Sequence, residues 1–152
     1  MGPGDNYHPT NSHVLPALIR RFHEATERGD ASVTCWGTGT PMREFLHVDD
    51  LGEACVFALE HWQPGQEEQQ FLNVGTGVDL TIRELDEAVA GATGYQGEIL
   101  WDASKPDGTL KKQLDVSRLA ELGWRSRIPL GEALRSTLEL FREKLRQQLV
   151  RL

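Results

Sequence analysis

Hydrophobic side chains along this 152-residue chain switch between helical and extended spacing. Apolar positions three or four residues apart predict four long or medium helices. These segments are about 12–28, a stretch from Asp50, a stretch from Thr81 and a stretch from Pro129. Short apolar runs predict strands between them. These runs are 33–36, 44–48, 71–74 and 99–101. The alternation predicts an α/β fold.

The expected helix ends depend on a few capping residues. Asp50 with Glu53 three residues later, and Thr81 with Glu84, both have the spacing of a capping box. Gly94 is expected to end the helix that Thr81 begins, and a short helix is expected from Ser117 to Gly123. Pro16 is compatible with the first helix only within its first turn.

Two short glycine sequences, Gly37-Thr38-Gly39 and Gly75-Thr76-Gly77, suggest phosphate loops. Neither has the further glycine or the strand-loop-helix spacing of a dinucleotide fingerprint, so turn formation is the better interpretation. The sequence also lacks a Gly-Lys-Ser/Thr element, which excludes a P-loop enzyme.

Composition narrows the class of protein. The length suits one domain or part of a larger one, and the formal net charge of −7 argues against a nucleic-acid binder. Any anion-binding site must then be a local cluster of basic side chains. No apolar run is long enough to cross a bilayer, and residues 1–5 do not resemble a secretion signal, so we expect a cytoplasmic protein. Cys35 and Cys55 are expected to be reduced, buried thiols.

Three residues could bind or transform a ligand, and each has a structural alternative. Histidine side chains can pass a proton near neutral pH, so His13 could do so, but its spacing alone favours a surface histidine near a helix cap. Arg43 could grip a diphosphate or form an ion pair with Glu44 or Asp49. Trp36 could stack on a ligand ring, although a core position is the commoner role.

Charged side chains also gather in the loop around Pro106. Lys105, Asp107, Lys111 and Lys112 could contact a phosphate or sugar, or form a solvated hairpin. His47, Asp49 and Asp50 do not complete a metal site, and capping explains Asp50 better.

Several long blocks of sequence resemble the GDP-L-fucose synthase family of extended short-chain dehydrogenases. The blocks are Asn11 to Ala25, Trp36 to Asp50, Asn73 to Gly77 with Thr81 to Leu85, and Ser104 to Thr109 through Trp124. The Arg-x-Phe-x-x-Val-x-Asp sequence of 43–50 is shared with many nucleotide-sugar epimerases and dehydratases. Asn11-Ser12-His13 and the 36–45 sequence are typical of the fucose synthase branch.

This resemblance implies an activity and a set of site residues. The parent enzyme would epimerise C3 and C5 of GDP-4-keto-6-deoxy-D-mannose and reduce C4 with NADPH, giving GDP-L-fucose. His13 would be the acid of epimerisation and lie near the nicotinamide, and the backbone at Gly2 would line the cofactor pocket. The substrate contacts would be Arg21, Trp36, Arg43, Asp107 and Lys112.

The family's glycine fingerprint, its Ser, its Tyr-x-x-x-Lys pair and its catalytic cysteine have no counterparts in 1–152. The resemblance therefore implies the C-terminal substrate-binding portion of a Rossmann-type enzyme, without the N-terminal dinucleotide domain. The isolated chain is expected to be inactive, and the parent enzyme to be a homodimer that binds a GDP-sugar and neither nucleic acid nor membrane. The alternatives are another NAD(P)-dependent nucleotide-sugar epimerase or dehydratase, or a non-catalytic nucleotide-sugar-binding module.

The helix expected from Asp50 is apolar around much of its circumference. Residues of about 50–95 are therefore expected to pack on the dinucleotide domain, and the isolated chain to expose an apolar patch and to associate.

Overall fold

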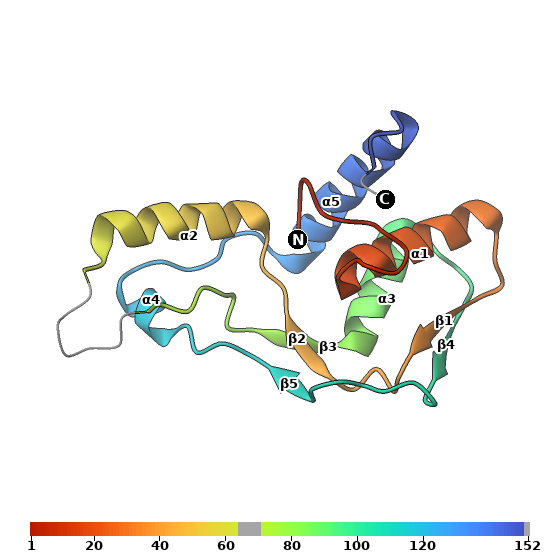
Figure 1. Ribbon diagram of the computed structural model, residues 1–152, viewed down its shortest axis with the longest axis horizontal. Coiled ribbons are helices and arrows are strands. Elements are labelled where there is room, and N and C mark those ends of the chain that lie inside the picture. The colour runs from red at the N-terminus through yellow and green to blue at the C-terminus, as the bar shows by residue number, and fades with distance from the viewer. Residues whose placement is uncertain (64–70, 151–152) are drawn as a thin grey trace.

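The computed structural model describes residues 1–63 and 71–150. They form an elongated α/β molecule in which a helical layer covers two small sheets (Figure 1). The helices are α1 Val14–Arg28, α2 Val48–His61, α3 Ile82–Thr93, α4 Ser117–Glu121 and α5 Leu130–Arg146. The strands are β1 Ser32–Trp36, β2 Met42–Glu44, β3 Asp79–Thr81, β4 Glu98–Asp102 and β5 Lys111–Lys112.

The main core lies where α1, α3 and α5 meet beside β1. Phe22, Leu85 and Phe141 are almost completely buried there, one from each helix. Their burial follows from the apolar stripe that each helix presents to the others. The predicted helices over 12–28, after Thr81 and after Pro129 are confirmed, although α5 begins one residue later, at Leu130. The apolar spacing of α5 also includes Leu145, but this side chain is 42% exposed.

The two sheets have different connections. Strands β1 and β4 pair in parallel, with Trp36 opposite Asp102 at the end of both strands. In the second sheet β2 is central: it is antiparallel to β3 and parallel to β5. The predicted strands at 33–36 and 99–101 are thus confirmed as β1 and β4.

Two predicted strands are wrong. The run expected at 44–48 is extended two residues earlier, as β2, because Val48 is already the first residue of α2. Residues 71–74 have no regular secondary structure, and no strand within 1–63 or 71–150 pairs with them. Leu72 and Val74 instead pack against Ala54, Leu119 and Trp124 in a second, smaller core. Strand β3, which pairs with β2, was not predicted.

The expected cap of α2 is also wrong. The N-cap is His47, whose ring Nδ1 accepts the Asp49 N–H at 3.3 Å. Asp50 lies inside the first turn, is 2% exposed, and accepts the Arg127 and Ile128 N–H groups at 3.2 and 3.1 Å. Its carboxylate thus fixes the loop before α5. The capping box of Thr81 with Glu84 and the left-handed Gly94 end of α3 are confirmed.

Helix α2 extends away from the main core (Figure 1). Ala54 is buried on one side of this helix, but the opposite side of the helix presents apolar side chains to solvent. This exposed stripe consists of Val48, Leu51, Cys55, Val56 and Leu59. Leu59 is 87% exposed. The expected apolar patch is therefore present, whereas the expected burial of Cys55 is wrong.

Candidate functional site

The parallel pairing of β1 and β4 brings two loops side by side. The loop of residues 37–41 follows β1, and the loop of residues 103–110 follows β4. The Gly37 N–H donates to the Asp102 carbonyl oxygen at 2.9 Å, so the pairing continues one residue beyond β1. Both loops then lead into the second sheet, through β2 and β5. Carboxyl ends of parallel strands are the usual position for ligand sites in α/β folds.

Asp107 joins the two loops. Its carboxylate accepts the Thr38 N–H at 2.7 Å and the Thr38 hydroxyl at 2.8 Å. Gly37 has φ 81°, and a Cβ at this position would overlap the Asp107 carboxylate. Gly37 and Gly39 are therefore turn glycines, as predicted, and the nearest amide is already occupied by an internal carboxylate.

Trp36 is the last residue of β1 and is 67% exposed, so a core position is excluded. The Lys105 ammonium lies 5.8 Å from the centre of its ring, within range of a weak cation–π contact. An exposed indole beside a cation, at the edge of two loops, is suited to stacking against a planar ring.

Arg43 and Lys112 lie directly opposite each other in the parallel pair of β2 and β5. Parallel partners project to the same face of a sheet, so two cations share one face. Gly108 lies beside the Arg43 guanidinium, which also donates to the Met42 carbonyl oxygen at 2.7 Å. Within 1–63 and 71–150, neither Arg43 nor Lys112 forms an ion pair, which excludes Glu44 and Asp49 as partners of Arg43.

Lys111 and Glu44, which neighbour this pair in the sheet, already have partners. Lys111 lies 3.1 Å from Asp79, across β2. Glu44 accepts hydrogen bonds from the Thr76 N–H and hydroxyl, from the Gly77 N–H at 2.8 Å and from the Leu114 N–H at 3.2 Å. The Gly75-Thr76-Gly77 loop thus surrounds a protein carboxylate. The cationic pair of Arg43 and Lys112 is therefore the candidate anion site of these loops.

Arg21 lies under β1 and not in the loops. Its guanidinium donates to the Thr34 carbonyl oxygen at 3.2 Å, two residues before Trp36. The Cys35 thiol and the Asp86 carboxylate lie within its electrostatic reach. Burial raises the pKa of Cys35 to about 12 and that of Asp86 to about 6, and Arg21 moderates both shifts.

Asp86 is a residue that sequence analysis missed. It is completely buried, and neither carboxylate oxygen has a hydrogen-bond partner of standard geometry in the described structure. The available signal was its place on the apolar face of α3, next to Leu85 and three residues before Val89. Burying an ionisable group at such a position costs free energy, so the group is a candidate for a specific role.

Gly2 and His13 lie away from the two loops. Gly2 is buried against the rings and methyl groups of His47 and Val48, with φ 141° and no room for a Cβ. His13 is the N-cap residue of α1, and its side chain is exposed and forms no capping hydrogen bond. Within the residues that the structure describes, no hydrogen bond or ion pair joins His13 to 36–43 or 102–112.

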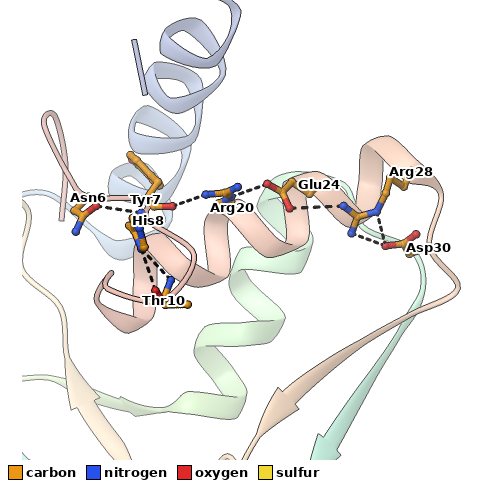
Figure 2. A network of polar contacts seen from close by, with 8 residues as sticks. All are labelled: Asn6, Tyr7, His8, Thr10, Arg20, Glu24, Arg28 and Asp30. Atoms are coloured by element: carbon orange, nitrogen blue, oxygen red, sulfur yellow. Dashed lines mark hydrogen bonds and ion pairs between the residues drawn. The ribbon is translucent and has the colours of Figure 1, made fainter. Parts of the chain in front are cut away.

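The segment before His13 is held to α1 by a polar network (Figure 2). The His8 Nδ1 atom accepts the N–H groups of Thr10 and Asn11 at 3.1 and 3.2 Å. Arg20 donates to the Tyr7 carbonyl oxygen at 3.0 Å and to Glu24 at 2.6 Å. His13 therefore follows a well-anchored turn.

The hydrogen bonds of the two glycine loops and of His47 bear on whether the chain could bind a dinucleotide. Asp107 and Glu44 occupy the amides of the two glycine loops, so neither is free for a pyrophosphate. The buried Nε2 of His47, beside Gly2, has no partner in the described structure. Among the described residues, therefore, neither glycine loop offers free amides to a dinucleotide phosphate, and Gly2 and His13 lie outside both loops. The described residues contain no cluster of three or more potential metal ligands, and none of their helices is long and apolar enough to cross a membrane.

A mainly apolar cavity lies between the second sheet and the start of α5. Its lining includes Leu80, the register partner of Arg43, together with Phe45, Val78 and Leu130. The cationic pair and an apolar cavity therefore lie at neighbouring positions of one sheet, an arrangement suited to a ligand with an anionic and an apolar part.

Known proteins support this interpretation of the fold. Residues 1–75 match the NAD dependent epimerase/dehydratase family. A crystal structure of a GDP-L-fucose synthetase from Naegleria fowleri superimposes with a TM-score of 0.84 at 25% identity, covering 100% of this chain and 45% of that one. The first 75 residues are thus similar to the NAD dependent epimerase/dehydratase family, and the chain has the fold of an extended short-chain dehydrogenase.

The chain is also similar to the C-terminal portion of GDP-L-fucose synthases. It is 54% identical over 147 residues to GDP-L-fucose synthase of Escherichia coli, covering 93% of this chain and 46% of the relative. It is 52% identical over 144 residues to probable GDP-L-fucose synthase 1 of Oryza sativa, covering 95% of this chain and 43% of the relative. The chain thus spans less than half the length of these curated relatives.

Proposed function

We propose that the chain forms the substrate-binding portion of an NADP-dependent GDP-L-fucose synthase. The observation that carries this proposal is the pair of cations Arg43 and Lys112, which share one sheet face and form no ion pair among the described residues. They lie near the exposed Trp36, in a chain similar to GDP-L-fucose synthases. The diphosphate of GDP-4-keto-6-deoxy-D-mannose would bind to the two cations. A planar part of the ligand would stack on Trp36.

The other site residues have separate roles in this proposal. Arg21 would fix β1 beneath Trp36 through its bond to Thr34, and Asp107 would fix the turn that follows Trp36. His13 would donate a proton during epimerisation at C3 and C5, from an exposed imidazole at the start of α1. Gly2 and His13 would border NADPH, which supplies the hydride for the C4 ketone when bound.

The proposal predicts a specific loss in Arg43→Ala. Removing one charged hydrogen-bond donor should weaken GDP-sugar binding by about 1 to 3 kcal/mol, roughly 5- to 150-fold. Calorimetric titration of the chain with GDP-mannose would measure this loss. Arg135→Ala, on the exposed face of α5, is the matched control and should bind normally. Equal affinity in wild type and Arg43→Ala would remove Arg43 from the site.

Other members of the family remain the alternative class. UDP-glucose 4-epimerase of Thermotoga maritima is similar in fold, with a TM-score of 0.77 and 30% identity over 95% of this chain. Titration with GDP-, UDP- and dTDP-sugars separates the two classes, because the proposal requires a preference for GDP. A chain that binds GDP-sugar but restores no NADPH oxidation with a complementing N-terminal half would be a binding module.

We further propose that about 50–95 packs on the dinucleotide domain of the whole enzyme, a cytoplasmic homodimer. The exposed stripe on α2 supports this, since Leu51, Cys55 and Leu59 are spaced four residues apart on one side. Leu59→Asp should reduce self-association and hydrophobic-dye binding of the isolated chain, whereas Leu149→Asp, near the end of α5, should not. A monodisperse wild-type monomer that binds no dye would contradict the packing proposal.

A further inference from the structure

Glu44 is the most heavily hydrogen-bonded carboxylate near the cationic pair of Arg43 and Lys112. One oxygen accepts the Thr76 N–H and hydroxyl and the Gly77 N–H, and the other accepts the Leu114 N–H. A Cβ on Gly75 would overlap this carboxylate, so the chain must approach it with glycine. One side chain thus joins three segments that are far apart in sequence.

These three segments are the ends of the three strands of the second sheet. Glu44 ends β2, the Thr76–Gly77 turn precedes β3, and Leu114 follows β5 by two residues. The sheet is short, and β5 contributes only Lys111 and Lys112 to it. Two residues of parallel pairing provide few backbone hydrogen bonds, so β5 depends on side-chain contacts to hold its register.

The register of β5 decides where Lys112 lies. In the observed register Lys112 faces Arg43, and a slip of one residue would turn Lys112 to the opposite face. Glu44 accepts from the N–H two residues beyond Lys112, and the ion pair of Lys111 with Asp79 holds the residue before it. Lys112 therefore lies between two fixed points.

We infer that Glu44 is a positioning residue, which holds Lys112 beside Arg43 and thereby shapes the diphosphate site. The inference rests on the proposed function only in assigning a diphosphate to these two cations. Glu44 itself does not touch the ligand. Its carboxylate also fills the amides of the Gly75-Thr76-Gly77 loop, so a ligand phosphate has no access to them.

Glu44→Gln tests this inference because two physical effects oppose each other. Removing a negative charge close to two cations should, by Coulomb attraction alone, tighten the binding of an anion a fewfold. If Glu44 acts by positioning Lys112, the substitution should instead weaken the binding of an anion. A glutamine keeps one oxygen for Thr76 and Gly77 but presents an amide N–H₂ to the Leu114 N–H, so this link is lost.

The experiment is calorimetric titration of the 152-residue chain with inorganic diphosphate at several salt concentrations. Glu44→Gln is expected to bind at least roughly tenfold more weakly, with a smaller salt dependence, because one cation no longer contributes. Hydrogen exchange at the Leu114 amide should become faster, while binding of uncharged guanosine should not change. Glu87→Gln, an exposed carboxylate on α3, is the control for charge and should match wild type.

Leu114→Pro tests the same link from the other side, because it removes the N–H and leaves Glu44 intact. It too should weaken diphosphate binding. Unchanged or tighter binding in Glu44→Gln, or failure of the wild-type chain to bind diphosphate, would overturn the inference. Diphosphate binding without a preference for GDP-sugars would instead refute the proposed function and leave the role of Glu44 in place.

Discussion

The buried carboxylate of Asp86 should make the stability of this protein fall as the pH rises from about 4 to about 6. Burial raises the pKa of Asp86 from 3.8 to about 6, so the folded chain holds a proton that the unfolded chain has already released. The stability that Asp86 contributes is fully present below its pKa in the unfolded chain. It is lost as the pH rises through its pKa in the folded chain. Above about pH 6 the folded chain contains an ionised, completely buried Asp86.

The size of the effect follows from the shift. A rise of about two pKa units corresponds to about 3 kcal/mol, at about 1.4 kcal/mol for each unit. Asp86→Asn has nearly the same shape and cannot ionise. The variant should therefore match wild type near pH 4 and be more stable by up to about 3 kcal/mol near pH 8. For a domain of this length that gain would raise Tm by roughly 6 to 12 °C.

Urea unfolding followed by circular dichroism, at several pH values between about 4 and 8, measures this difference. Other groups titrate in the same range. Burial lowers the pKa of His23, and hydrogen bonds to Thr81 and Ser104 lower the pKa values of Glu84 and Asp102. These contributions are common to both proteins and cancel when the variant is compared with wild type. Glu139→Gln, on the exposed side of α5, should show no such difference.

A difference between Asp86→Asn and wild type that does not depend on pH would refute this reasoning. Lower stability of the variant near pH 8 would do the same. Either result would mean that Arg21 or the Cys35 thiol compensates the buried charge more fully than the shifted pKa indicates.

Two further predictions concern the thiols and a helix cap. Cys35 is buried and its pKa is raised to about 12, whereas Cys55 is exposed. A thiol reagent near pH 8 should therefore modify Cys55 quickly and Cys35 only after unfolding. Mass spectrometry of wild type and Cys55→Ser would check this, and rapid double modification of the folded chain would contradict it. Thr81→Ala removes the side-chain half of the α3 capping box, in which the Thr81 hydroxyl accepts the Glu84 N–H. It should cost about 0.5 to 2 kcal/mol in urea unfolding, whereas Thr40→Ala, outside any helix, should cost less.

The sequence predicted the helices well because their determinants are local. The apolar stripe of α1, the capping box at Thr81 and the left-handed Gly94 all act within a few residues. The two β1–β4 strands were predicted for a similar reason, since both are short apolar runs between helices. Trp36 and Arg43 were named as candidates beside a structural alternative for each. The structure leaves Trp36 exposed and Arg43 half-buried, and the site roles of both are proposals.

The errors arose where distant partners decide the structure. Residues 71–74 have the composition of a strand but no described strand beside them, whereas β3 forms from a polar-flanked segment because β2 is there to pair with it. Asp50 has the ideal residue type for a cap, yet the amides of Arg127 and Ile128, far along the chain, are its partners. The roles of Glu44 and Asp86 could not be predicted for the same reason.

The parallel pairing of β1 with β4 has a further consequence for the order of folding. Ser32 pairs with Glu98, and the link between Thr38 and Asp107 spans 69 positions. Contacts between residues so far apart close large loops and form slowly, whereas α1 and α3 form from neighbouring residues. The ligand loops should therefore acquire their geometry last, after the helices are complete. During refolding, helical circular dichroism should recover before the capacity to bind diphosphate.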